Sequence, residues 1–517
     1  MASAQPYLLS HLLDASAERD ASATALVDDD ATLDAAGLAE RVARLAGALV
    51  DGGVADGDRV MVFAAKSADT YIAMHAAMHA GAIAVPVNAR AGTDAVRTLI
   101  DAIEPSAVVL DRQSARAGPT DVAPRLSVGH DAAGRHLPWD AVDGFEPLTP
   151  RTRTGDDPAY MITTSGSTGT PKSIVHTHRS GLRYAELGAQ CYGLVADDRM
   201  ANVAAFHFDQ STFELYSGPL VGAAVVLVPE VLLRFPASVA DLLRDESITI
   251  WYSVPTILRQ LLERGALEAD HVRTLRWVLF GGELFPPAEL RAWMELAPNA
   301  RFSNVYGPAE VNQCTFHHLE SPPADDESIP IGRAWDDTRC RIEPTGSDPR
   351  HGELLVATTT AMEGYWGRPD LTDAAFEVTT DAGAMTTRWY RTGDLVDEDD
   401  HGRLHFRGRV DRQVKVRGVR IELESVESTL DAIDGVTASA AGVTSTGALG
   451  ALVTTSGLDE TALRAAVRAA SAPGAEPEFL EIVDDLPRTG SDKIDHATVA
   501  DRIAALDAAP PAARTTS

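Results

Sequence analysis

The sequence predicts an α/β protein in two parts, a large N-terminal unit over residues 1–410 and a smaller one over residues 411–505. Short β-rich apolar runs alternate with helical patterns up to about residue 400, which is typical of layered sheets and helices. An acidic, turn-rich segment (394–411) then interrupts the pattern, and a shorter alternation follows it. Residues 506–517 are rich in alanine and proline, and we expect them to be disordered.

The N-terminal unit begins with a helical stripe of Leu38, Val42, Leu45 and Leu49, followed by a buried strand over 59–65. Its later elements are expected as strands over 106–111, 223–229, 247–255 and 276–282, and as helices over 240–245 and 255–265.

The C-terminal unit is predicted to contain two strands and two helices in alternation. They are expected as a strand over 413–422, a helix over 423–433, a strand over 448–455 and a helix over 458–470. We therefore place the domain boundary near Asp411.

Composition excludes several classes of function. A formal net charge of −30 argues against nucleic acid and anionic membrane as partners. The N-terminus has no basic leader before an apolar run, and no apolar stretch is long enough to span a bilayer. The three cysteines, Cys191, Cys314 and Cys340, are too far apart for a CxxC-type metal or redox site. A cytoplasmic location is the expectation.

Lysine is rare in this chain. Among 45 basic residues only Lys66, Lys172, Lys415 and Lys493 are lysines. A compact ammonium on a flexible stem differs from a planar guanidinium, so these four positions are candidates for specific roles.

The stretch Met161–His178 contains the loop "TTSGSTGTPK", which lacks the spacing of a P-loop. Glycines allow consecutive backbone N–H groups to converge on an anion, and Ser165, Ser167 and Thr168 add hydroxyl donors. Lys172 would supply a point charge. By itself, such a loop is more often a polar surface turn than a phosphate site.

Four further motifs follow in order: "NVYGPAEVNQCT" (304–315), "YRTGDLV" (390–396), "GRVDRQVKVRGVRIE" (408–422) and "PRTGSDKID" (487–495). Together with the loop they resemble the adenylate-forming superfamily, which comprises acyl-CoA synthetases, luciferases and the adenylation domains of nonribosomal peptide synthetases. The resemblance extends from about residue 80 to Lys493.

The resemblance implies a large N-terminal adenylation core of β-sheets flanked by helices, and a small mobile C-terminal domain. It also implies a two-step reaction with ATP and Mg²⁺ and without a tightly bound prosthetic group. A carboxylate attacks the α-phosphate to give an acyl-adenylate and pyrophosphate, and a thiol then displaces AMP.

Motif positions assign the nucleotide site by resemblance. Tyr306 would pack against adenine, Asp394 would accept hydrogen bonds from the ribose hydroxyls, and Arg409 would contact ribose or phosphate. Glu310 would bind magnesium. The β- and γ-phosphates would be held by Thr164, Ser165, Gly166, Ser167, Thr168, Gly169 and Lys172.

Lys493 resembles the lysine that reaches from the C-terminal domain to the substrate carboxylate and the α-phosphate. A cation that neutralises two anions lowers the barrier where charge develops. Asp411 occupies the family's hinge position, about which the domain would turn to admit the thiol. The chain departs from the usual motifs at Ala309, Ser173 and Asp492, and none of these changes removes an essential charge.

The segment "FHFDQSTFELY" (206–216) resembles the "FDxS" segment of amino-acid adenylation domains, in which the aspartate pairs with the substrate ammonium. Asp209 would have this role, since a carboxylate in a neutral pocket needs a cation. A helix-capping aspartate is the alternative. The remaining pocket residues would be Gln210, Phe213, Tyr252, Leu279, Gly281, Val305, Gln313 and Cys314.

These pocket residues contain no lysine, arginine or second carboxylate, which favours a neutral, small-to-medium amino acid. The combination of Tyr252, Leu279 and Cys314 resembles free-standing L-proline–carrier-protein ligases, whereas Gly281 and Gln313 depart from it. The chain ends soon after Lys493 without a carrier module, so we expect a separate phosphopantetheinylated carrier protein as partner. The alternatives are an acyl- or aryl-CoA synthetase that uses CoA, and a catalytically degenerate nucleotide-binding regulator.

Overall fold

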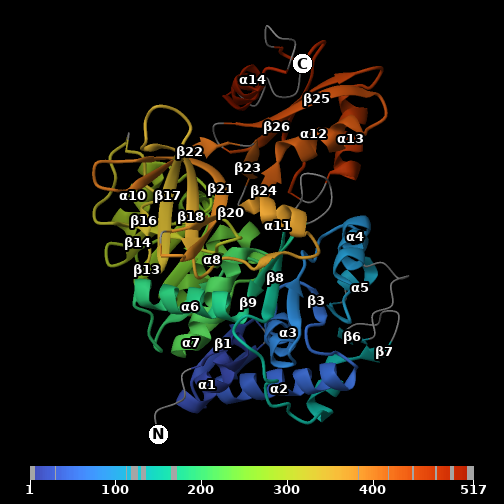
Figure 1. Ribbon diagram of the computed structural model, residues 1–517, viewed down its shortest axis with the longest axis vertical. Helices are drawn as coiled ribbons and strands as arrows, with labels where there is room; N and C mark the ends of the chain where they lie inside the picture. The colour runs from blue at the N-terminus through green and yellow to red at the C-terminus, as the bar shows by residue number, and fades with distance from the viewer. Residues whose placement is uncertain are drawn as a thin grey trace. The chain divides into compact units, whose positions relative to one another are not determined.

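A computed structural model describes residues 6–29, 31–111, 113–117, 126–129, 135–164, 172–325, 327–381, 383–410, 412–416, 419–444, 447–471, 474–488 and 494–508. These residues form two compact units. The first contains the described residues up to Thr163 together with Lys172–Val410, and the second contains Thr164 and the described residues that follow residue 410. The α/β fold class predicted from the sequence is confirmed (Figure 1).

The first sheet of the N-terminal unit has a central set of parallel strands and antiparallel strands at both edges. Its order is β16 (Arg333–Ala334), β15 (Thr315–Leu319), β14 (Arg301–Tyr306), β13 (Trp277–Gly281), β12 (Ile250–Ser253), β10 (Arg199–Asn202), β11 (Ala224–Leu227), β1 (Thr24–Asp28) and β2 (Ala31–Asp34). Parallel pairing requires crossovers, and helices supply them along this chain.

The second sheet is also mostly parallel. Its order is β19 (Gly364–Tyr365), β9 (Lys172–Thr177), β8 (Pro158–Thr164), β4 (Ile83–Pro86), β3 (Arg59–Phe63), β5 (Ala107–Leu110), β6 (Leu126–Gly129) and β7 (Arg135–Leu137).

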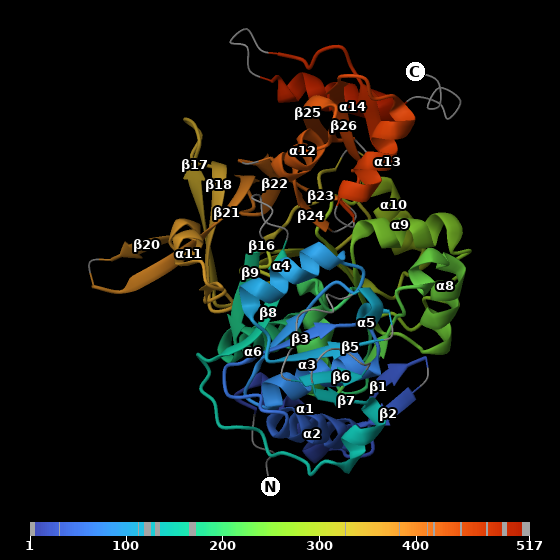
Figure 2. The same ribbon diagram turned by 90° about the vertical axis from the view of Figure 1, so that its right-hand side faces the viewer.

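A third, antiparallel sheet stands to one side of the N-terminal unit in Figure 2, with α11 (Pro369–Ala375) against it. Its order is β17 (Thr338–Pro344), β18 (His351–Thr358), β21 (Thr386–Glu398) and β20 (Phe376–Thr380), and β22 (Leu404–Arg409) also pairs with β21.

The remaining helical segments of this unit connect and cover the sheets. The α-helices are α1 (Leu12–Arg19), α2 (Ala35–Asp51), α3 (Ala68–His79), α4 (Thr93–Ile103), α5 (Ser114–Ala117), α6 (His178–Tyr192), α7 (Gly218–Val221), α8 (Pro236–Asp245), α9 (Pro255–Arg264) and α10 (Pro287–Leu296). The short turns are η1 (Leu9–His11), η2 (Trp139–Gly144), η3 (Asp209–Ser211) and η5 (Leu232–Arg234), and η4 (Phe213–Ser217) is a π-helical turn.

The main core joins the first two sheets through the helices between them. The predicted stripe of α2, Leu38, Val42, Leu45 and Leu49, is buried, and the Asp34 side chain caps this helix by accepting from the Gly37 N–H at 2.7 Å. Helix α3 is apolar on most sides and buried along most of its length, which is expected of a helix enclosed by other elements.

The C-terminal unit contains two small sheets and three helices among its described residues. Its elements are β23 (Gln413–Val416), β24 (Val419–Glu422), α12 (Leu423–Asp431), β25 (Val436–Val443), β26 (Leu449–Thr455), α13 (Glu460–Ala470), β27 (Phe479–Ile482) and α14 (His496–Ala508). The structure adds β25, β27 and α14 to the elements expected from the sequence, and two further details differ. The segment 413–422 forms an antiparallel hairpin instead of one strand, because Gln413–Val416 pairs with Val419–Glu422 and the register brings Val416 opposite Val419. Helix α14 also extends to Ala508, three residues into the expected tail.

Within the described residues, no helix combines the length and apolarity needed to cross a bilayer.

Candidate active site

The predicted substrate pocket gathers at the ends of three adjacent parallel strands, β12, β13 and β14. Their register places Tyr252 beside Leu279, and Gly281 beside Val305. Carboxyl ends of parallel strands meet at one edge of a sheet, which is where α/β proteins bind ligands. At Gly281, a Cβ atom would lie 2.2 Å from the Val305 carbonyl oxygen, so the close approach of the two strands requires glycine there.

Asp209 begins the turn η3, next to this edge of the sheet. The N-cap of the turn is Phe208, so Asp209 is not its capping residue. Burial, and after it the charge of Asp209, raises the pKa of Tyr252, while a hydrogen bond with Gln210 acts in the opposite direction. The Asp209 charge also adds to the raised pKa of Tyr184. The structure therefore brings Asp209, Gln210 and Tyr252 together.

Phe213, in the turn η4, supplies an aromatic wall. Its ring packs edge-on against Tyr252 and Tyr192, with centroids 5.7 Å apart in both pairs. The predicted pocket residues Phe213, Tyr252, Leu279 and Val305 belong to one buried cluster, which also includes Tyr192.

Gln313 and Cys314 adjoin this cluster. The Gln313 amide donates to the Tyr192 hydroxyl at 2.8 Å, and its Oε1, which is buried, finds no hydrogen-bond partner among the residues that the structure describes. The Cys314 N–H donates to the Tyr306 carbonyl at 2.9 Å, so Cys314 is tied to the end of β14. Tyr192 was missed by reasoning from sequence, because it lies on α6, outside every motif.

The three residues predicted to hold the nucleoside contact one another. The Tyr306 hydroxyl donates to Oδ2 of Asp394, and the Arg409 guanidinium donates to Oδ1. Asp394 and Arg409 are register partners of β21 and β22, and the Thr392 hydroxyl accepts from the Asp394 N–H at 3.0 Å. Burial and the Asp394 carboxylate raise the pKa of Tyr306, so its phenol keeps its proton and can donate.

Glu310 is buried in the loop after β14, with 1% of its surface exposed. The Tyr365 hydroxyl donates to its Oε1 at 2.8 Å, and its carbonyl accepts from the Met362 N–H at 2.7 Å. One residue earlier, the Ala309 carbonyl accepts from His176 Nε2 at 2.9 Å. Reasoning from sequence missed Tyr365 and His176, although His176 lies within the stretch that includes the phosphate loop.

Lys172 begins β9 and is half-buried. Thr164 ends β8, and its side chain lies outside what the structure describes. The predicted loop residues Ser165, Gly166, Ser167, Thr168 and Gly169, the hinge Asp411 and the catalytic Lys493 also lie outside the described residues.

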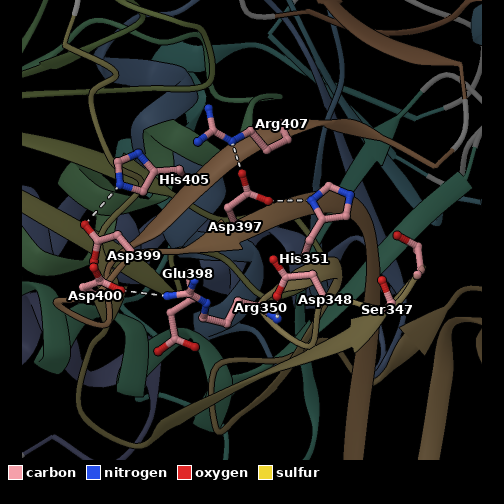
Figure 3. Close-up of a pocket in the computed structure, with 12 residues that line it drawn as sticks. Ser347, Asp348, Arg350, His351, Asp397, Glu398, Asp399, Asp400, His405 and Arg407 are labelled. Carbon is pink, nitrogen blue, oxygen red and sulfur yellow. Dashed lines mark hydrogen bonds and ion pairs between the residues drawn. The ribbon is translucent and has the colours of Figure 1, made fainter.

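An open pocket of about 780 Å³ lies away from these residues, beside the third sheet (Figure 3). Two of its carboxylates are tied to neighbouring side chains: Asp397 to His351 and Arg407, at 2.5 Å each, and Asp400 to Arg350 at 2.8 Å. None of the predicted site residues lines it. We assign no function to this pocket.

Comparison with known proteins gives a consistent result. A family model described as AMP-binding enzyme matches residues 13–366. An L-proline--[L-prolyl-carrier protein] ligase of Pseudomonas fluorescens is 33% identical over 423 residues, which are 79% of this chain and 80% of that protein. The ligase of the same name from Streptomyces coelicolor is 34% identical over 413 residues, 75% of each chain.

Solved structures share the fold. The crystal structure of IdnL1 is 28% identical and has a TM-score of 0.78, covering 93% of this chain and 99% of that one. The Vibrio cholerae adenylation domain AlmE, in complex with glycyl-adenosine-5'-phosphate, has a TM-score of 0.79 at 23% identity, covering 97% of this chain and 98% of that one.

Proposed function

The chain belongs to the AMP-binding enzyme family, and we propose that it activates a neutral amino acid with ATP and transfers it to a separate carrier protein. Two relatives, the ligases of Pseudomonas fluorescens and Streptomyces coelicolor, are named for L-proline and an L-prolyl-carrier protein. Tyr252, Leu279 and Cys314 favour a substrate of that kind, whereas Gly281 and Gln313 leave open a different side chain or ring.

The observation that carries this proposal is the setting of Asp209. Its charge helps to raise the pKa of Tyr252 and, more weakly, that of Tyr184, in a pocket whose other predicted residues are uncharged. The ammonium of an amino acid can pair with the Asp209 carboxylate, and such pairing is worth more in a partly apolar pocket than in water. An unaminated acid offers no such cation.

The nucleotide half of the site would hold ATP through residues that already contact one another. Asp394 would bind the ribose, since a carboxylate can accept further hydrogen bonds besides those from Tyr306 and Arg409. Tyr306 would pack against adenine, Arg409 would reach ribose or phosphate, and the loop from Thr164 to Lys172 would hold the leaving pyrophosphate.

The candidate site suits a magnesium ion that enters bound to the phosphates of ATP. The described residues include no group of three or more histidine, cysteine or acidic side chains that could hold a metal by itself. Magnesium usually takes one or two carboxylates, and phosphates and water complete its shell. Glu310, oriented by Tyr365, is suited to be such a single ligand. When bound, the ion would neutralise charge on the phosphate oxygens.

The reaction would proceed in two steps. In the first, an oxygen of the amino-acid carboxylate attacks the α-phosphorus, and the bond to pyrophosphate breaks. Lys493 would lower the repulsion between the two anions as they meet. In the second, a carrier thiolate attacks the acyl carbon and AMP leaves. Between the two steps, rotation of the C-terminal domain about Asp411 would withdraw Lys493 and admit the thiol.

A pyrophosphate-exchange screen tests the proposal. The substrates are proteinogenic, D-, β- and cyclic amino acids, with their unaminated analogues as matched controls. We expect exchange that depends on the amino group. Stimulation by unaminated acids alone would indicate the CoA-ligase alternative, and ATP binding without exchange would indicate the regulator. Loading of holo-carrier protein, compared with CoA, then identifies the thiol acceptor.

A further inference from the structure

Lys66 is the lysine that none of the family motifs includes. It lies between β3 of the second sheet and α3. Its ammonium donates to three consecutive backbone carbonyls, those of Asn202 at 2.8 Å, Val203 at 2.8 Å and Ala204 at 3.4 Å. An ammonium has three N–H donors, so this arrangement uses all of them. Asn202 ends β10 of the first sheet, and Lys66 therefore links the two sheets.

The segment that follows these carbonyls carries Asp209. A buried hydrogen bond between side chains joins the two ends of this segment: the Asn202 amide donates to Glu214 Oε2 at 3.1 Å. Glu214 directly follows Phe213, and 1% of its surface is exposed. Residues 203–213 thus form a loop, and both of its ends are held at Asn202.

The inside of this loop is also ordered by hydrogen bonds. The Phe208 N–H donates to the Ala205 carbonyl at 2.9 Å, and the Ser211 hydroxyl donates to the Phe208 carbonyl at 2.7 Å. Because these bonds fix the turn relative to its base, a shift at residues 202–204 would be transmitted to Asp209.

Burial lowers the pKa of Lys66 to about 7, and the nearby Glu230, Glu214 and Asp28 act in the opposite direction. Burial also raises the pKa of Glu214 to about 8.

We propose that Lys66 is a positioning residue for the amino-acid site, which holds the 203–213 loop so that Asp209 faces the substrate ammonium. The proposal rests on the function assigned to Asp209 above. It requires that loss of Lys66 impair amino-acid binding much more than ATP binding, because Tyr306 and Asp394 lie on other strands, β14 and β21, where Asp394 is held by Tyr306 and Arg409.

The test uses the full chain with Lys66→Met, Lys66→Arg and, as a control, Arg179→Met, which removes a cation from an exposed ion pair with Asp156. We expect Lys66→Met to raise the KM for the amino acid roughly tenfold to a hundredfold, as for a lost charge-assisted hydrogen bond, and to leave the KM for ATP within about twofold. Lys66→Arg should recover part of the loss. Equal changes in both KM values, or none, would overturn the proposal.

Two further measurements keep the proposal decidable. If Lys66→Met fails to fold, the pair Glu214→Leu and Glu214→Gln replaces it: the leucine variant should raise the amino-acid KM and the glutamine variant should restore it, and equal values would overturn the proposal. Hydrogen exchange of the Phe208 and Ser211 amides needs no substrate, and we expect it to be faster in Lys66→Met. Unchanged protection of these amides would refute the anchoring by Lys66. This holds whatever the pyrophosphate-exchange assay gives: a wild type without amino-acid-dependent pyrophosphate exchange would refute the proposed function separately.

Discussion

Replacing Asp209 by alanine should weaken amino-acid binding and leave ATP binding intact. Breaking a fully buried ion pair by removing one partner costs about 3–5 kcal/mol. Asp209 is only partly buried, so the lower value applies. About 3 kcal/mol corresponds to an increase of roughly 150-fold in the KM for the amino acid. Asp209→Asn keeps the shape and loses the charge, and its KM should fall between those of the alanine variant and the wild type.

The assay is amino-acid-dependent pyrophosphate exchange, with the KM for ATP measured in parallel. Asp156→Ala is the matched control, because Asp156 pairs with Arg179 on the surface. An unchanged amino-acid KM in Asp209→Ala would exclude the ammonium contact. An equal rise in both KM values would indicate a general disturbance of the site and would contradict the reasoning from charge.

Three other variants test separate parts of the site. Lys493→Ala should abolish adenylate formation and largely spare thiol transfer from a supplied aminoacyl-adenylate, and equal loss of both steps would contradict the two-state account of the C-terminal domain. Asp394→Asn should raise the KM for ATP roughly tenfold to a hundredfold, because charge-assisted hydrogen bonds are lost, and a wild-type value would remove Asp394 from the nucleotide site. Burial lowers the pKa of His176 from 6.5 to about 4, so the stability due to its neutral form is present above pH 6.5 and is lost as the pH falls towards 4. Between pH 6.5 and 5, the free energy of unfolding measured in urea should therefore fall by about 2 kcal/mol less in His176→Asn than in the wild type. An equal fall in both proteins would refute this.

Much of the site could be predicted because its chemistry lies in short, ordered segments. Asp209, Glu310 and Asp394 were each identified from the residues beside them in sequence. The strand pattern likewise predicted β12 and β13, since buried parallel strands are apolar runs of recognisable length. The hairpin β23–β24 was read as one strand, because two short strands around a glycine have the same apolar pattern as one interrupted strand.

What the sequence determined by itself was the inventory of charged groups and their order: the carboxylates proposed for an ammonium and for a metal, and the lysines proposed for phosphate. Only the tertiary structure decided which groups support them. Tyr365 reaches Glu310 across 55 residues of sequence, and Lys66 reaches Asn202 across 136. Such contacts depend on the order of strands within sheets and on the packing of one sheet against another, and no local pattern encodes the distance between two segments that meet only after the chain has folded.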